Sequence, residues 1–595
     1  MLRTKIVCTI GPASRDPQVL ARLIAAGMDV ARLNFSHGDH AFHAENIHNL
    51  RQASAEAGKA VAILVDLQGP KLRVGALPSE GLTLEEKELV LLSPRADAVA
   101  GEVEQDSGAK VIPVQFQRLA EAVEPGYRIL LDDGLLELTV EAVQAPDVRC
   151  RVLVGGVLTS NKGINLPRAA LSIPAITEKD KEDLRFALEH QADWIALSFV
   201  RRAQEVLDLK QLIQDLSPFG RLTPVIAKIE KPEALDNIDE IIAAADGIMV
   251  ARGDLGIEMA PESVPMIQKM IIKKCNQAGV PVITATQMLD SMIRNPRPTR
   301  AEASDVANAI LDGTDAIMLS GETAVGKYPE QAVRTMRNIA MQAEQVLLAN
   351  ASVTPPKPGR VSLSSAVSHA AVDIANLLNA SAILAPTASG ATARQLSHLR
   401  PISPVIAITP SVAVQHQLAL HWGVTPLISR RAENTDEMFQ DAIKVALDRE
   451  LVKAGDIVVI TGGSAGAQPG TTDLVKVIRL PRRLACGEGV GTRTVVGRLR
   501  KLVGPLSDEV VVRYDEIVVT PQTDRTFVKP LRNAAGLISG ESGPDCHSYL
   551  LANELGLSAV LGVSNLDELP EGEWVTLSPE LGLVVERSDI VPRSK

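Results

Sequence analysis

Charged side chains follow two apolar runs in the middle of the chain. Lys228 and Glu230 end the run 224–230, and Asp254 follows the run 247–251. Strand alternation would place Lys228 and Glu230 on one face, where buried charge is costly unless it is paired or binds a metal. If the two runs are neighbouring parallel strands, Glu230 and Asp254 meet at one sheet edge as oxygen ligands for Mg²⁺ or Mn²⁺. The alternative interpretation is a structural Lys–Glu ion pair at a strand end.

Three polar residues alternate along another apolar run near the N-terminus. Arg32, Asn34 and Ser36 occupy every second position of residues 31–38. On a strand all three would face the same way, and we expect that way to be the interior of a barrel. The planar guanidinium of Arg32 suits a phosphate, and Asn34 and Ser36 offer oxygens to a cation or donors to a phosphate.

Further polar residues follow other strand-like runs. Asp66 ends one run, and Lys71 and Arg73 add positive charge just beyond it. Thr286 follows a later run and could bind a carboxylate or order a water, although threonine is also common in strands for its shape. The free N–H groups of a short helix opening at Asp254 could hold an anion.

A loop rich in small hydroxyl residues lies in the second half of the chain. Thr387, Ser389, Gly390 and Thr392 follow an apolar run and lead into a helical pattern. Such a loop can bind phosphate at a helix N-terminus. It lacks the Gly-Lys-Ser/Thr of a P-loop. We interpret it as an effector site for a phosphorylated sugar or nucleotide.

The elements that position these residues alternate between apolar strands and amphipathic helices. Continuous apolar strands joined by helices predict a (β/α)₈ TIM barrel, an α/β fold with its chemistry at the strand ends. The eight predicted strands are Lys5–Ile10, Val30–Phe35, Ala60–Leu67, Trp194–Val200, Pro224–Glu230, Gly247–Ala251, Pro281–Thr286 and Ala316–Leu319.

Three further domains are predicted around this barrel, which takes residues 1–69 and 171–350. Residues 70–170 alternate short strands with Gly and Pro, which favours a small all-β lid inserted after the third strand, with a passive appendage as the alternative. Residues 351–485 follow a Pro-rich break and predict an α/β effector domain. Residues 486–595 predict a small C-terminal β/α domain.

Composition excludes several classes of function. The 595 residues carry a net charge of −11, which gives no basic footprint for nucleic acid. We find no apolar run of the length that a membrane span needs and no signal peptide. The five scattered cysteines lack CxxC spacing, so we expect reduced thiols and a cytoplasmic protein.

Together these motifs resemble those of the pyruvate kinase family over residues 2 to about 482. The resemblance implies a catalytic barrel, a lid and an effector domain, and a homotetramer. It also implies phosphoryl transfer from phosphoenolpyruvate to ADP, giving pyruvate and ATP. The motifs that carry it are Arg3–Ser14, Ala31–Gly38, Lys162–Pro167, Lys228–Pro232, Met249–Gly256, Ala285–Leu289 and Met318–Thr323.

The resemblance also implies roles for individual residues. Glu230 and Asp254 would bind Mg²⁺ or Mn²⁺, and Arg32 and Lys228 would hold the transferring phosphoryl group. The amides of Gly253 and Asp254, with Thr286, would hold the substrate carboxylate, and a water beside Thr286 and Lys228 is a plausible proton donor. The residues that would contact the nucleotide phosphates are Asn34, Phe35, Ser36, His37, Arg73 and Lys162.

The sequence departs from the family pattern around the monovalent cation. Many members need K⁺ and carry Glu where this chain has Lys71, and Thr where it has Leu67. We predict that the Lys71 ammonium replaces K⁺ and that activity is independent of it. The cation region would comprise Asn34, Ser36, Asp66 and Leu67.

The C-terminal domain is similar to the phosphohistidine segment of phosphoenolpyruvate-utilising enzymes. His547 stands at the histidine position, but Asp545 replaces the usual Thr two residues before it. We therefore expect a structural or assembly role for this domain rather than phosphate transfer.

Two other functions are consistent with parts of the sequence. A metal-dependent aldolase or lyase acting through a pyruvate enolate would also use Glu230 and Asp254, but Arg32, Arg73 and Lys162 favour nucleotide and phosphoryl handling. A catalytically silent sugar-phosphate sensor would rest on the loop 387–394. The intact set of Lys228 with the two carboxylates argues against it.

Overall fold

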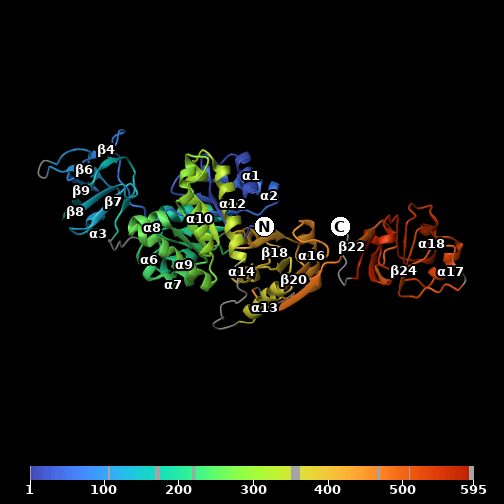
Figure 1. The fold of residues 1–595 in the computed structure, drawn as a ribbon. Coiled ribbons are helices and arrows are strands. Elements are labelled where there is room, and N and C mark those ends of the chain that lie inside the picture. The colour runs from blue at the N-terminus through green and yellow to red at the C-terminus, as the bar shows by residue number, and fades with distance from the viewer. Residues whose placement is uncertain are drawn as a thin grey trace. The chain divides into compact units, whose positions relative to one another are not determined.

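The computed structural model describes residues 2–104, 108–167, 174–217, 222–349, 362–464, 470–507 and 509–587. The chain forms two compact units. The first comprises Met1–Thr354, Ala393–Ile402 and Ser411–Pro426, and the second Pro355–Thr392, Ser403–Pro410 and Leu427–Lys595. Figure 1 colours the chain from the N-terminus to the C-terminus.

Eight parallel strands close into the predicted barrel in the first unit. Their order around the barrel is β1-β16-β15-β14-β13-β12-β3-β2, so each of the eight predicted runs contributes one strand. The strands are β1 Lys5–Thr9, β2 Val30–Asn34, β3 Ala62–Asp66, β12 Trp194–Leu197, β13 Val225–Ile229, β14 Gly247–Ala251, β15 Val282–Ala285 and β16 Ala316–Leu319.

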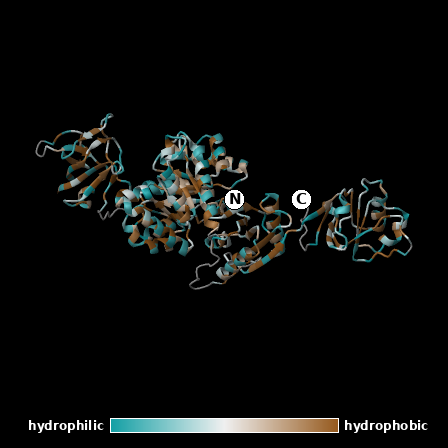
Figure 2. Cartoon of the chain, in the orientation of Figure 1, coloured by the Kyte–Doolittle hydropathy of each residue, from teal (hydrophilic) through white to brown (hydrophobic). Residues whose placement is uncertain are grey.

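Burial explains why these strands read as continuous apolar runs. Every residue of β13 and β14 is buried, because a barrel strand contacts side chains inside the barrel and helices outside it. One buried cluster fills the interior, and a larger one lies between strands and helices. Figure 2 colours each residue by its hydropathy, from teal for hydrophilic to brown for hydrophobic.

Helices connect the barrel strands and cover them. Local sequence signals fix several of their starts: Thr177 and Thr299 each form a capping box with an acidic residue three positions on. The barrel-associated helices are α1 Pro17–Ala26, α2 His40–Ala57, α4 Glu178–Glu189, α5 Ala203–Leu216, α6 Glu233–Asp236, α7 Ile238–Ala244, α8 Arg252–Glu258, α9 Val264–Ala278, α10 Arg300–Leu311, α11 Gly321–Ala324 and α12 Pro329–Ala349.

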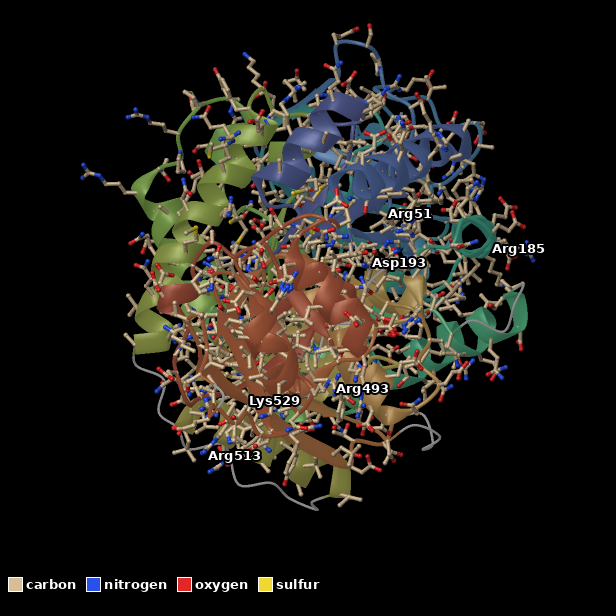
Figure 3. The ribbon with its side chains drawn as sticks, turned by 90° about the vertical axis from the view of Figure 1, so that its right-hand side faces the viewer. Arg51, Arg185, Asp193, Arg493, Arg513 and Lys529 are labelled. Carbon is tan, nitrogen blue, oxygen red and sulfur yellow. The ribbon has the colours of Figure 1, made fainter. Side chains whose placement is uncertain are left out.

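A buried ion pair supports the amino end of β12. Asp193 is 1% exposed and accepts a hydrogen bond from Arg51 of α2 at 2.9 Å, and the two side chains lie together in Figure 3. The same carboxylate accepts the Ile63 N–H at 2.8 Å. The ion pair with Arg51 and the hydrogen bond from Ile63 together stabilise the buried carboxylate of Asp193. The ion pair therefore connects α2 to the barrel wall.

The insertion after β3 forms its own β structure with its own apolar core. Its main sheet has the order β11-β7-β8-β9-β5-β6, and β10 pairs with β4 separately. Its elements are β4 Leu82–Leu84, β5 Leu89–Ser93, β6 Lys110–Pro113, α3 Leu119–Ala122, β7 Arg128–Leu131, β8 Leu136–Gln144, β9 Asp147–Val154, β10 Gly156–Leu158 and β11 Ile164–Asn165.

A five-stranded sheet of order β19-β18-β17-β20-β21 follows the barrel. β17 runs parallel to β18 and β20, and β21 runs antiparallel to β20. Its strands and helices are α13 Leu363–Leu377, β17 Ala382–Pro386, α14 Ala391–His398, β18 Val405–Thr409, α15 Val412–Leu418, β19 Val424–Ile428, α16 Thr435–Asp448, β20 Ile457–Gly462 and β21 Leu474–Arg479.

The C-terminal region contains an eight-stranded mixed sheet of order β22-β29-β28-β24-β25-β26-β27-β23. Its strands are β22 Arg483–Cys486, β23 Glu488–Val490, β24 Val495–Lys501, β25 Glu516–Thr520, β26 Gly536–Ser539, β27 Ala559–Leu561, β28 Trp574–Ser578 and β29 Leu583–Glu586. The helices are α17 Val528–Leu531 and α18 His547–Leu555.

Candidate active site

Lys228 lies among oxygen atoms at the carboxyl end of the barrel. Its Nζ is 2.9 Å from Glu230 Oε1 and 3.2 Å from Asp66 Oδ1, and it donates a hydrogen bond to Ser198 Oγ at 2.8 Å. The Lys228 side chain is 10% exposed, and those of the two acids are almost fully buried. The Lys228–Glu230 ion pair of the alternative interpretation is therefore present, and Asp66 joins it.

Arg32 of β2 contacts Asp66 at the end of the neighbouring strand β3. Its Nε and Nη2 lie 2.8 and 2.7 Å from Asp66 Oδ2, and its Nη1 donates to Thr9 Oγ1 at 3.0 Å. Register explains the meeting, because Asn34 at the end of β2 is paired with Asp66 at the end of β3. Asp66 thus holds both cations, Arg32 and Lys228, between its two oxygens.

The ionisation of this cluster follows from its charges. Burial alone would lower the pKa of Lys228, but Asp66 and Glu230 outweigh it and the pKa lies above its ordinary value. Burial alone would raise the pKa of Asp66, but Lys228 and Arg32 lower it overall. The Lys228 ammonium and the Asp66 carboxylate are therefore both charged at neutral pH, and the Arg32 guanidinium contacts the same carboxylate.

The pKa of Glu230 shifts in the opposite direction from that of Asp66, and the carboxylate of Asp254 contributes to this difference. Burial and the negative charge of Asp254 raise the pKa of Glu230, although Lys228 opposes the change. Its Oε2 accepts the Phe199 N–H at 2.8 Å. The two acids follow neighbouring strands, since Ile229 of β13 is paired with Val250 of β14.

This donor set fits a hard divalent cation. Two carboxylates that disfavour each other's charge would both be stabilised by Mg²⁺ or Mn²⁺. Within the described residues no group of three or more His, Cys, Asp and Glu side chains is arranged to hold a metal. Further ligands would come from water and substrate oxygens, as is usual for Mg²⁺.

Thr286 and Gly253 are brought together beside the metal candidates. Thr286 Oγ1 accepts the Gly253 N–H at 2.7 Å and donates to Ala285 O at 2.6 Å. Thr286 lies one residue beyond β15 at φ +68°, and Gln287 follows at φ +54°. Two successive left-handed residues other than glycine are strained by about 1–3 kcal/mol each, so the surrounding structure must enforce this turn.

Arg252 supplies that enforcement from the start of α8. Its Nη2 donates to Thr286 O at 2.9 Å, and its Nη1 donates to Asp305 Oδ1 at 2.8 Å. The side chain is 10% exposed. The residue next to Gly253 therefore fixes the carbonyl of Thr286 while Gly253 itself contacts the Thr286 hydroxyl.

The predicted nucleotide segment turns immediately after β2. Asn34 Oδ1 accepts the Ser36 N–H at 3.1 Å, and this side-chain turn ends the strand. The expectation that Ser36 continues the strand toward the barrel interior is therefore wrong. Phe35 is buried and its ring stacks on His43 with centroids 4.0 Å apart.

Three cations lie within electrostatic reach of His37, which follows β2 at the carboxyl edge of the barrel. Burial lowers its pKa, and Arg73, Lys71 and Arg32 lower it further. The three cations predicted to face phosphates or replace K⁺ thus lie within electrostatic reach of one histidine. Arg73 Nη1 donates to Asn161 O at 2.9 Å, next to Lys162, whose Nζ is 2.8 Å from Asp132 Oδ1.

The residues predicted to form the monovalent-cation region, and Lys71 that would replace the ion, have different neighbours. Leu67 is 1% exposed and packs in the apolar cluster between strands and helices. Asp66 is bound to Lys228 and Arg32, as described above. Lys71 lines a pocket that also contains Asp254.

The predicted effector loop connects β17 to α14. Thr387 Oγ1 accepts the Gly390 N–H at 3.0 Å, which closes the loop as a tight turn at Gly390, φ +81°. Thr392 is 3% exposed, and its Oγ1 is 2.8 Å from Thr472 Oγ1. Ser389 lies between these two residues in the same loop.

His547 is the first residue of α18 in the C-terminal sheet domain. Its Nδ1 lies 2.6 Å from Thr523 Oγ1, which is 3.1 Å from Ser548 Oγ. Glu541 Oε2 accepts hydrogen bonds from the Ser548 and Thr523 N–H groups at 3.1 and 3.0 Å. The histidine is thus part of a hydroxyl–carboxylate cluster.

Sequence reasoning missed four residues of the barrel site: Thr9, Ser198, Arg252 and Glu258. Thr9 and Ser198 are single hydroxyl residues at strand ends, which no pattern separates from ordinary strand residues. Arg252 precedes the singled-out Gly253 and could have been found from that position. Glu258, described below, is distant in sequence from its partners.

A closed parallel barrel with paired cations and carboxylates at its carboxyl edge defines a barrel enzyme suited to anionic substrates and a divalent metal. Family models described as "Pyruvate kinase, barrel domain", "Pyruvate kinase, alpha/beta domain" and "PEP-utilising enzyme, mobile domain" match residues 1–333, 365–478 and 512–582. The chain belongs to the pyruvate kinase family.

Curated relatives resemble the chain over nearly its whole length. Pyruvate kinase 2 of Synechocystis sp. is 44% identical over 589 residues, 98% of this chain and 97% of the relative. The pyruvate kinases of Staphylococcus saprophyticus and Geobacillus stearothermophilus are each 44% identical over 98% of this chain, and over 99% and 98% of their own lengths. The predicted family, fold class and transferase activity are confirmed, and the aldolase alternative is not favoured.

Proposed function

We propose that the barrel mouth transfers the phosphoryl group of phosphoenolpyruvate to ADP, giving pyruvate and ATP as the last step of glycolysis. The observation that carries the assignment of residues is the cluster of Arg32, Lys228 and Glu230 around Asp66. Phosphoryl transfer needs fixed positive charge more than covalent chemistry, and this cluster provides it in a buried setting.

The substrate end of the reaction would be held by residues of three strands. Arg32 and Lys228 would bind the oxygens of the transferring phosphoryl group. The amides of Gly253 and Asp254, with the Thr286 hydroxyl, would hold the carboxylate. A Mg²⁺ or Mn²⁺ ion bound by Glu230 and Asp254 would neutralise charge on the substrate oxygens. The family generally uses a divalent metal.

The transfer breaks the bond from phosphorus to the enol oxygen and forms one to an oxygen of ADP. The enolate left behind takes a proton at carbon to become pyruvate, and a water held beside Thr286 and Lys228 would deliver it. Asn34, Phe35, Ser36, His37, Arg73 and Lys162 would contact the ADP phosphates. The pKa of His37 is lowered first by burial and then by Arg73, Lys71 and Arg32, and the nearness of these cations supports the assignment.

A coupled assay of pyruvate formation tests the proposal. We expect pyruvate from phosphoenolpyruvate only when ADP and Mg²⁺ or Mn²⁺ are both present. Pyruvate formed at an equal rate without ADP would instead indicate a lyase or phosphatase.

We also propose that activity does not require K⁺ and that the Lys71 ammonium supplies a positive charge in place of the ion. Its influence on His37 supports a position at this edge of the barrel. Turnover should be equal in matched Na⁺ and K⁺ buffers. A large stimulation by K⁺ would contradict the proposal, and Lys71→Glu should create such a stimulation.

Regulation and assembly complete the proposal. The closed turn of Thr387 and Gly390, with Ser389 and Thr392, would bind the phosphate of a sugar phosphate or nucleotide effector. We expect a cytoplasmic homotetramer, as is typical of the family. No described helix is long and apolar enough to cross a membrane. Light scattering and a scan of phosphorylated effectors with Ser389→Ala test these two points.

A further inference from the structure

Glu258 is a buried acid at the end of α8, the helix that begins with Arg252, Gly253 and Asp254. The residue is 7% exposed. Its Oε1 accepts hydrogen bonds from Lys231 Nζ at 2.6 Å and from Asn165 Nδ2 at 3.0 Å. Its Oε2 is buried and has no hydrogen-bond partner among the described residues.

The two partners of Glu258 come from different parts of the candidate site. Lys231 directly follows Glu230 after β13, so it belongs to the metal-binding segment. Asn165 lies on β11 of the lid, three residues after Lys162. One carboxylate oxygen therefore joins the lid strand to both segments that carry the predicted metal ligands.

Apolar packing around this contact is incomplete. Glu258 lines a pocket of about 240 Å³ between the lid hinge and the barrel mouth. Apolar side chains, among them Leu72, Ile164, Leu166 and Phe199, line much of this pocket, but the open space keeps them from packing closely across it. The polar bonds of Glu258 therefore contribute to the position of the lid strand.

The charge of Glu258 makes the contact strong and selective. A buried carboxylate must be paired, and the Lys231 ammonium provides the charge partner. Asn165 adds a directional hydrogen bond to an ionised acceptor, which is stronger than a neutral one. The second oxygen is buried and has capacity for another donor.

We propose that Glu258 is a positioning residue that fixes lid strand β11 relative to the metal-binding carboxylates, and thereby sets how Lys162 meets the nucleotide phosphates. The inference rests on the proposed phosphoryl transfer for its kinetic consequence only. The bond between lid and barrel is a property of the free enzyme.

The test compares Asn165→Ala, Glu258→Gln and the double variant, with Glu262→Gln as the control at an exposed acid near α8. Asn165 is only partly buried, so its removal should leave the fold intact. Losing a hydrogen bond to a charged group predicts about a tenfold rise in KM for ADP in Asn165→Ala. KM for phosphoenolpyruvate should change by less than about twofold, because the barrel residues are untouched.

Hydrogen exchange of the free enzyme gives a second readout that needs no activity. Exchange of residues 159–167 should quicken in Asn165→Ala and in Glu258→Gln, and stay unchanged in Glu262→Gln. The double variant should be no worse than the more severe single variant, because Asn165→Ala removes the bond from the lid that Glu258→Gln weakens.

Three results would overturn the inference. They are an unchanged KM for ADP in Asn165→Ala, an equal rise in both Michaelis constants, or unchanged exchange of residues 159–167. If the wild-type enzyme formed no pyruvate from phosphoenolpyruvate and ADP, the proposed function would fail. The exchange experiment would still decide whether Glu258 fastens the lid.

Discussion

The barrel mouth and the C-terminal domain each contain a carboxylate that gathers hydrogen bonds, in opposite electrostatic settings. Glu230 is 2% exposed, and burial together with Asp254 raises its pKa despite Lys228. Glu541 is partly exposed, and hydrogen bonds from Ser548 and Thr523 outweigh burial and lower its pKa. At the barrel mouth, Glu230 and Asp254 place two negative charges within electrostatic reach of each other. In the C-terminal domain, hydrogen bonds from Ser548 and Thr523 stabilise the charge of Glu541.

This difference separates a site prepared for a ligand from one that stabilises a fold. Repulsion between Glu230 and Asp254 is relieved when a cation binds, so the strain is useful. Around Glu541 the hydroxyl and amide donors already meet the charge, and His547 is held by Thr523. We therefore expect large effects on catalysis from the barrel cluster and small ones from the C-terminal cluster.

The largest effect should come from Lys228→Met. Removing the ammonium leaves Asp66 and Glu230 buried without their shared cation and takes away a charge from the transferring phosphoryl group. We expect kcat to fall by about 10³-fold or more, since buried charges dominate such transition states. Steady-state kinetics checks this, with circular dichroism to confirm folding.

Lys181→Met, at a partly exposed position of α4, is the matched control and should retain full activity. A Lys228→Met enzyme with more than a tenth of wild-type turnover would remove the main difference between the two clusters.

Arg252→Lys should have the next largest effect. A lysine cannot bind Thr286 O and Asp305 at once as the guanidinium does. The strained turn at Thr286 should relax, and kcat/KM for phosphoenolpyruvate should fall by about 10–100-fold. KM for ADP should change much less, and the two Michaelis constants measured side by side decide the point.

Arg300→Lys, at the exposed start of α10, serves as the control for Arg252. Equal effects on both substrates would show that Arg252 supports the barrel in general rather than the Thr286 turn.

A smaller effect is expected on the pH dependence of the C-terminal domain. The pKa of Glu541 is lower in the folded protein than in the unfolded chain. As the pH falls, the unfolded chain therefore takes up this proton before the folded protein does, which favours unfolding. The stabilisation from Glu541 is therefore present at neutral pH and is lost in acid. Glu541→Gln should destabilise residues 536–561 at pH 7 and much less at pH 3, measured by rate-corrected hydrogen exchange.

Glu554→Gln, at an exposed position of α18, should show no such pH-dependent difference. If Glu541→Gln were equally destabilising at both pH values, the carboxylate charge would have no part in holding this cluster.

The smallest effect on catalysis should come from His547→Ala. The histidine has Thr523 as its partner and lies in a domain for which we predict a structural or assembly role. Turnover should stay within about twofold of wild type, since changes away from the chemistry are usually mild. Labelled phosphoenolpyruvate should leave no acid-labile phosphate on the chain.

A phosphohistidine lost in His547→Ala would reverse this expectation. It would show that the C-terminal cluster carries chemistry of its own.

The sequence by itself determined the barrel strands and the residues at their ends. Continuous apolar runs have few alternatives to buried parallel strands, and the chemistry of a barrel lies at the carboxyl ends of those strands. Lys228, Glu230, Arg32 and Thr286 were therefore found from local pattern alone. The family resemblance then supplied roles that spacing could not.

Only the tertiary structure decided which side chains share partners. Asp66 proved to hold Arg32 and Lys228 together, Ser198 to contact Lys228, and Glu258 to join Lys231 to Asn165. Asn165 lies 93 residues before Glu258 in the chain, and Lys231 lies 27 residues before it. Hydrogen bonds and ion pairs depend on distances of a few ångströms, and a one-dimensional pattern carries no such distance between strands, helices and lid.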